Sequence, residues 1–341
     1  MLGFTTHLRL ALLASLAFFA PPAPRDSGQT AAPAFRVREW VEVEKVLDAD
    51  TLHVRRKEGS ARLRLLCVDA EERFHPGQES SPGKPQTVFG EETALWAESL
   101  FAELGKDGKP ARVGLCFPHD GEEHDVYGRL LCHVVLPDGG DYELKLVREG
   151  RSPYFNKYGN SEVAHAAFVA AQASAQAQKL GSWNPATNAP KTAGTPSAKR
   201  DYERLLPWWN ARAQAVDGFR KRRAAGERGL YDAADCAALD ALVGQEVELF
   251  CEIEGRPHES KGELALDLVS GERERHLRLV VPEESVQALA PAKLEQLAAP
   301  YRQNYFYARG KLERGPRGLR LALSDPKQIR RAGPEPEKPV R

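Results

Sequence analysis

The chain has 341 residues, which is enough for two domains of ordinary size with a hydrophobic core each. A hydrophobic content of 42% excludes a wholly disordered chain, and the equal numbers of basic and acidic residues, 48 each, give no indication of a nucleic-acid partner. The charge is unevenly distributed, because residues 35–184 carry more acidic than basic side chains and residues 185–341 carry more basic ones. The first region would repel a polyanion unless a bound cation changed the local sign.

The N-terminus has the pattern of an export signal. Arg9 ends a short polar region, and an apolar run over residues 10–20 follows it. This run is shorter than the roughly 20 residues that cross a bilayer, and a buried N-terminal helix is the alternative interpretation. We expect residues 1–34 to hold a signal peptide and a short mature segment. The protein is then secreted or periplasmic, with no stable membrane insertion after signal removal.

Alternating apolar and polar residues predict a small α+β barrel domain over residues 35–184. The predicted strands are a meander at 41–66 and a pair at 111–117 and 130–136; the predicted helices are 90–104, 142–149 and 163–180. A stretch rich in Pro, Ala and Thr predicts a linker at 185–198.

The region after the linker predicts a helical segment at 199–244 and then a small barrel at 245–331. The helical pattern covers 202–223 and 233–242, and five short strand-like runs follow, with a helical insertion near 286–297. The tail at 332–341 is polar and is expected to be disordered. Of the five cysteines, Cys236 and Cys251 could form a disulfide or could be buried small apolar residues.

Three short segments carry the chemistry, and each is expected at a strand end or a turn. They are D-A-D-T, with Asp50; R-L-L-C-V-D-A-E-E, with Arg64, Asp69 and Glu72; and D-V-Y-G-R, with Arg129. Two carboxylates that hold a hard cation, a third that polarises water and two guanidinium groups are suited to attack on a phosphodiester. Each residue alone could be a turn former or a surface ion-pair partner.

These segments resemble those of the staphylococcal nuclease (thermonuclease) family, calcium-dependent phosphodiesterases. F-G-E-E-T-A, L-V-R-E-G and K-L-G-S-W follow in the family's order, so that the resemblance covers about residues 41–183. It implies a five-stranded barrel of the oligonucleotide-binding (OB) type with three helices. After the linker, the runs at 249–254, 305–314 and 319–329 resemble a second OB-like module. Its residues Tyr305, Phe306, Tyr307, Arg309 and Lys311 offer aromatic rings that could stack on bases and basic side chains beside them.

The resemblance also implies roles for individual residues. Asp50 and Asp69, with the backbone carbonyl of Ala70, would bind Ca²⁺. Because Ca²⁺ prefers six to eight oxygen ligands, water and the substrate phosphate would supply the others. Glu72 would accept a proton from the attacking water or orient it. Glu71 stands where the family has Pro and could compete with Glu72 for this role.

Arg64 and Arg129 would bind the phosphate oxygens, and Arg129 is the better candidate for stabilising the departing 5′ oxygen. Tyr127 matches the family pattern and would contact the substrate. One aromatic ring of the segment from Tyr154 to Tyr158 would contact a base, and the resemblance does not decide which one.

The function that this resemblance implies is that of a secreted calcium-dependent nuclease of DNA and/or RNA that leaves 3′-phosphate ends. Its C-terminal domain would bind nucleic acid, a cell surface or a protein partner. The alternative is a non-catalytic module that binds nucleic acid or protein on a nuclease-like scaffold.

Overall fold

The computed structural model describes most of the chain beyond the predicted export signal. The described residues are 35–75, 77, 83–105, 107–119, 121–189, 198–260, 262–271 and 276–337. The predicted signal peptide at 1–34 and the end of the predicted tail lie outside them. Within these residues, no helix has both the length and the apolar character needed to span a membrane.

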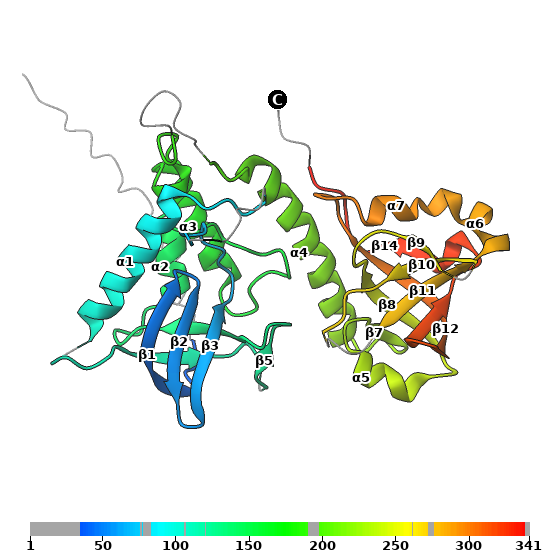
Figure 1. The fold of residues 1–341 in the computed structure, drawn as a ribbon, viewed down its shortest axis with the longest axis horizontal. Coiled ribbons are helices and arrows are strands. Elements are labelled where there is room, and N and C mark those ends of the chain that lie inside the picture. Colours follow the sequence, from blue (N-terminus) through cyan, green and yellow to red (C-terminus); the bar gives the residue numbers. More distant parts are fainter. Residues whose placement is uncertain are drawn as a thin grey trace, which may run out of the picture. The chain divides into compact units, whose positions relative to one another are not determined.

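The N-terminal sheet closes into a five-stranded barrel (Figure 1). Its strands are β1 (Glu39–Asp48), β2 (Thr51–Arg56), β3 (Gly59–Leu65), β4 (Arg112–Cys116) and β6 (Leu130–Val135), with β5 (Glu123–His124) added at the edge of β6. The antiparallel order β3-β2-β1-β4-β6 is closed by a parallel pairing of β3 with β6. This order confirms the predicted OB-type barrel.

Alternation along the strands builds the core of this barrel. In β1 the buried side chains include Val41, Val43 and Val46, and in β3 Leu63 and Leu65 point inward. The three predicted helices are present as α1 (Val88–Leu104), α2 (Tyr142–Arg148) and α3 (His165–Ala177), and a short 3-10 turn, η1 (Gly181–Trp183), follows them.

A second barrel follows helix α4 (Tyr202–Ala224) and repeats the strand order of the first. Its strands are β8 (Glu246–Glu252), β10 (Glu263–Asp267), β11 (Leu277–Pro282), β12 (Tyr305–Gly315) and β13 (Gly318–Ala322). The strand β11 pairs in parallel with β13, and a bridge between Ile253 and Leu268 joins the ends of β8 and β10. The predicted OB-like barrel is therefore present.

Smaller elements complete the second half of the chain. The predicted helical insertion is divided into α6 (Glu283–Leu289), η3 (Ala290–Ala292) and α7 (Leu294–Leu297), and the predicted helix at 233–242 is reduced to the short turns α5 (Cys236–Leu239) and η2 (Asp240–Leu242). The short strands are β7 (Leu230–Asp232), β9 (His258–Ser260) and β14 (Ile329–Arg331), the last preceded by η4 (Pro326–Gln328). The two barrels have separate hydrophobic cores, and the domain limits remain predictions.

One expectation for the second barrel is wrong, and the alternative left open for its two cysteines is decided. The aromatic rings of Tyr305, Phe306 and Tyr307 are buried, and the ring of Phe250 stacks on that of Tyr305 at 4.8 Å, so these rings belong to the core and are not a platform for bases. Cys236 and Cys251 form no disulfide in the described structure; the sulfur of Cys236 lies 3.6 Å from the carbonyl of Ala233.

Gly90 is required where the first turn of α1 crosses the chain at Glu72, because a Cβ atom there would lie 2.1 Å from the Glu72 carbonyl oxygen. We predict that Gly90→Ala lowers the free energy of unfolding by about 2–3 kcal/mol, since the backbone must shift. The matched control is Gly218→Ala in α4, where nothing lies within 4 Å; it should raise stability by about 0.5–1 kcal/mol. Urea unfolding of both variants checks this, and equal stabilities would contradict the packing at Glu72.

Candidate functional site

The guanidinium group of Arg64 joins the two predicted cation ligands. Arg64 lies in β3, where its Nη1 is 2.8 Å from Asp50 Oδ2 and its Nη2 is 2.9 Å from Asp69 Oδ1. Asp50 occupies the turn between β1 and β2, and the antiparallel register places Thr51 directly opposite Arg64. The closed barrel therefore brings two acids that are 19 positions apart onto one cationic side chain.

The carboxylate of Asp69 is fully buried and is surrounded by three cations. Lys84 Nζ lies 2.7 Å from Oδ1, which also faces Arg64, and Arg200 binds Oδ2 and donates to the Asp69 carbonyl oxygen at 2.9 Å. Burial alone would raise the pKa of Asp69, but the charges of Arg200, Lys84 and Arg64 hold this pKa well below its usual range. Asp69 is therefore an anion throughout the physiological pH range.

Asp50 is linked to Ala70 and lies near a further carboxyl group, that of Asp48. Asp50 Oδ2 accepts the backbone N–H of Ala70 at 3.1 Å, which ties the predicted third ligand residue to the first. Burial first, and then the charges of Asp50 and Glu72, raises the pKa of nearby Asp48 to about 8. The protonated form of Asp48 is therefore favoured beside Asp50.

Glu72 and Glu71, the two candidates for a general base, have different environments. Glu72 is partly exposed and its Oε1 lies 3.5 Å from Lys84 Nζ. Glu71 is buried, and both its oxygens are occupied: Oε2 accepts from Thr87 at 2.5 Å and from Asn188 at 2.6 Å, and Oε1 from Tyr202 at 3.1 Å. Glu71 therefore has a structural role, and Glu72 is the acid that remains accessible to water.

Three residues that the sequence analysis did not single out attach the C-terminal half to this site. Arg200 and Tyr202 lie at the start of α4 and bind Asp69 and Glu71, and Asn188, within the predicted linker, binds Glu71 and the backbone N–H of Phe89. The Arg200 guanidinium lies 5.5 Å from the centre of the buried ring of Trp209. No spacing or periodicity connects positions 131 residues apart, so these contacts had no signal in the sequence.

Arg129 is held by its own loop in the described structure and makes no ion pair there with Asp50 or Asp69. Asp125 Oδ2 binds Arg129 Nε and Nη2, both at 2.7 Å, and Asp125 Oδ1 accepts the backbone N–H groups of Tyr127 and Arg129. The parallel register aligns Leu130 with Leu63, so Arg129 lies at the end of the strand beside the one that carries Arg64.

The aromatic residues predicted to contact a base have different exposures. Tyr127 and Tyr158 are 70% and 59% exposed, and the Arg129 guanidinium lies 5.4 Å from the Tyr127 ring. Tyr154 is buried; its hydroxyl accepts the backbone N–H of Ser161 at 2.8 Å, and its ring stacks on Phe168. Of the two rings, Tyr158 is the accessible one, and Tyr154 is a core residue, which corrects its inclusion among the substrate-binding residues.

The residues at the end of the first barrel fit a hard divalent cation. Asp50 Oδ2 and Asp69 Oδ1 both face the guanidinium group of Arg64, which supplies positive charge between them. Carboxylate oxygens without sulfur or imidazole donors are the ligands of Ca²⁺ or Mg²⁺.

Comparisons with known proteins agree with this geometry. The family described as "Staphylococcal nuclease homologue" matches residues 62–185. Over 144 residues the chain is 31% identical to "Endonuclease YhcR" of Bacillus subtilis (strain 168), a match that covers 42% of this chain but only 11% of that protein. It is 30% identical over 148 residues to an "Uncharacterized endonuclease" of Escherichia coli O157:H7, of which it covers 79%.

The contact of Arg200 with Asp69 is open to a stability test. We predict that Arg200→Met lowers the free energy of unfolding by about 1–3 kcal/mol, less than for a buried charge left alone, because Lys84 and Arg64 still face Asp69. Arg204→Met is the matched control: Arg204 lies in the first turn of α4, is exposed, and among the described residues its side chain contacts the Tyr301 ring, at 4.0 Å. Calorimetric unfolding measures both, and an unchanged Arg200 variant would show that the contact contributes nothing.

Proposed function

Because the chain belongs to the staphylococcal nuclease homologue family, we propose that it is a nuclease that hydrolyses phosphodiester bonds of DNA and/or RNA. The observation that carries the proposal is the convergence of Asp50 and Asp69 on Arg64, with Glu72 beside them, at one end of the first barrel. A group of charges of both signs, partly buried and next to exposed aromatic rings, is suited to binding and attacking a phosphate ester.

Asp50 and Asp69 would hold the divalent cation, which we propose to be Ca²⁺, with the carbonyl oxygen of Ala70 as a third protein ligand. When bound, the cation would supply positive charge to a phosphate oxygen at the site. Arg200 binds Asp69 Oδ2 while Arg64 binds Oδ1, so that Arg200 fixes the orientation of this carboxylate. Arg200 is therefore a positioning residue for this ligand.

The remaining residues act on water and on the phosphate. Glu72, the accessible acid, accepts the proton of a water molecule or orients it toward phosphorus. Arg64 and Arg129 donate to phosphate oxygens and favour the charge that accumulates during attack; Arg129 serves the departing 5′ oxygen, so that 3′-phosphate ends remain. Asp125 binds Nε and Nη2 of Arg129, so that Nη1 of the same guanidinium can donate to the phosphate while Asp125 orients the side chain.

The exposed rings of Tyr127 and Tyr158 would contact the nucleotides next to the cleaved bond.

We also propose that the N-terminal signal exports the protein to a secreted or periplasmic location. The C-terminal barrel would bind nucleic acid, a surface or a protein partner, and the start of α4 supports the nuclease site directly through Arg200.

The alternative function, a binding module without catalysis, has less support. A module that only binds phosphate does not need the accessible acid Glu72 next to the buried pair Asp50 and Asp69. It also gains nothing from carboxylates that neutralise Arg64, the group that would bind the phosphate. Tight binding of single-stranded DNA without any cleavage, with and without Ca²⁺, would favour this alternative.

We predict that the protein cleaves single-stranded DNA with Ca²⁺ and that a chelator abolishes the cleavage. Glu72→Gln should bind the DNA as the unchanged protein does but should lower turnover by about a hundredfold or more, because the proton acceptor is lost. Glu92→Gln, an exposed position on α1, is the control and should be fully active. A gel cleavage assay with end-group analysis measures both; full activity of Glu72→Gln would remove this residue from the mechanism.

A further prediction concerns the loop that holds Arg129. Asp125→Asn keeps the shape of the side chain but removes its charge, so Arg129 is oriented less well, and we expect kcat to fall by about tenfold with a stable fold. Asp138→Asn, in a neighbouring turn where Asp138 accepts only the Gly140 N–H among the described contacts, should leave kcat unchanged. A higher kcat in Asp125→Asn would mean that Asp125 restrains Arg129 and does not position it.

A further inference from the structure

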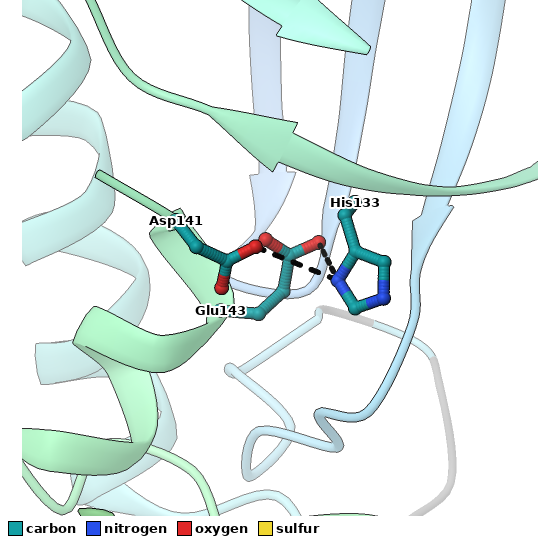
Figure 2. A group of neighbouring side chains, drawn as sticks. All are labelled: His133, Asp141 and Glu143. Atoms are coloured by element: carbon teal, nitrogen blue, oxygen red, sulfur yellow. Dashed lines mark ion pairs between the residues drawn. The ribbon is translucent and has the colours of Figure 1, made fainter. Parts of the chain in front are cut away.

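A second group of ionisable residues is buried between strand β6 and the helices α2 and α3, separate from the proposed nuclease site. His133 projects from β6, Asp141 is the N-cap of α2, and Glu143 lies in the first turn of that helix. All three side chains are almost fully buried, with 1%, 1% and 0% exposed. Figure 2 shows the imidazole and the two carboxylates turned toward one another.

Atoms that could bind a metal remain unsatisfied in this group. Among the described residues, His133 Nδ1 and Asp141 Oδ2 have no hydrogen-bond partner, although both are buried. Their separation is 3.5 Å, and His133 Nδ1 lies 3.7 Å from Glu143 Oε1; both exceed the usual hydrogen-bond length. Buried polar atoms are rarely left without partners, so these two require an explanation.

The other contacts hold the carboxylates in place without satisfying them. Asp141 Oδ1 accepts the backbone N–H of Leu144 at 2.6 Å, which turns Oδ2 toward the imidazole. Both oxygens of Glu143 share a single donor, the N–H of Val134, at 3.1 Å each. The backbone N–H groups of α2 and β6 thus orient the two carboxylates before any metal binds. Hydrogen bonds of this kind commonly orient the side chains that bind a metal.

The two carboxyl groups also differ from Asp69 in having no basic partner in the part of the chain that the structure describes. Within the described residues, no lysine or arginine forms an ion pair with Asp141 or Glu143, whereas the equally buried Asp69 has three. Aromatic rings line the site, with Phe35 at 5.2 Å and Phe168 at 6.1 Å from the His133 ring. A divalent cation would balance two carboxylates and leave the site neutral.

The spacing of the ligand atoms indicates which cation would bind. Zinc binds imidazole and carboxylate at about 2.0–2.2 Å, so two ligands of a tetrahedral ion lie about 3.3–3.6 Å apart. The observed 3.5 and 3.7 Å are close to this separation. Mg²⁺, an octahedral ion with ligands at about 2.0–2.1 Å, would need neighbouring ligands about 2.9 Å apart, and the imidazole is not a preferred ligand of Mg²⁺ or Ca²⁺.

We propose that His133 Nδ1, Asp141 Oδ2 and Glu143 Oε1 bind a structural Zn²⁺ ion, which the three atoms can approach because they lie within 4.8 Å of one another. Three protein ligands with water in the fourth position are a known zinc arrangement. The ion joins β6 to the start of α2, next to the bridge between Val135 and Asp141. It stabilises the barrel and takes no part in cleavage.

Metal analysis of the purified full-length protein tests the proposal. After dialysis against metal-free buffer, we expect one zinc per chain, and after stripping with a strong chelator we expect added Zn²⁺ to raise the Tm. Glu143→Gln keeps the shape and an acceptor for Val134. It should weaken zinc binding by at least about a hundredfold. Loss of a residue that only orients a metal ligand already costs about 10–100-fold, and Glu143 is proposed to bind the metal directly.

Two controls separate this site from others. His119→Gln alters a histidine that also lies near two carboxylates, at 3.6 and 3.5 Å, but on the surface, and it should retain zinc. Asp50→Asn alters the proposed nuclease site and should lose cleavage but retain zinc. The zinc proposal is wrong if the unchanged protein takes up no zinc and Glu143→Gln is at least as stable as the unchanged protein. In that case the three side chains share protons and bind no metal. This conclusion does not depend on the result of the nuclease assay.

Discussion

The buried carboxylate of Asp69 is the constraint on which the proposed site depends. An ionised acid without access to water is unfavourable unless cations face it, and here Arg64, Lys84 and Arg200 do so. Each comes from a different part of the chain: a barrel strand, the segment before α1, and the residues before α4. One charge therefore fixes the position of three segments, and the C-terminal half is joined to the first barrel at its most acidic point.

The first barrel contains two buried acid groups that differ in how their charge is balanced. Asp69 is kept ionised by basic side chains, whereas in the described structure Asp141 and Glu143 face the imidazole of His133 and each other. The first arrangement leaves an ionised carboxylate at the proposed nuclease site. The second leaves ligand atoms enclosed by aromatic rings, a setting for an ion that is incorporated once and retained.

The sequence predicted the parts of the structure that local patterns determine. Alternation located the five strands of each barrel, and the order of short charged segments located Asp50, Arg64 and Asp69, which the closed sheet then brings together. It did not predict Arg200, because a single basic residue after a linker has no periodicity. It misplaced Tyr154 and Tyr307, because a strand or loop tyrosine has the same pattern whether its ring faces the core or the solvent.

The most direct test of the account is a crystal structure with Ca²⁺ and a short, cleavage-resistant single-stranded DNA. The account predicts a cation about 2.3–2.6 Å from oxygens of Asp50 and Asp69, with Arg64 and Arg129 on the same phosphate and Arg200 still bound to Asp69. A structure in which DNA binds elsewhere, or in which the two acids retain only their contacts with Arg64 and Lys84 at saturating Ca²⁺, would contradict it.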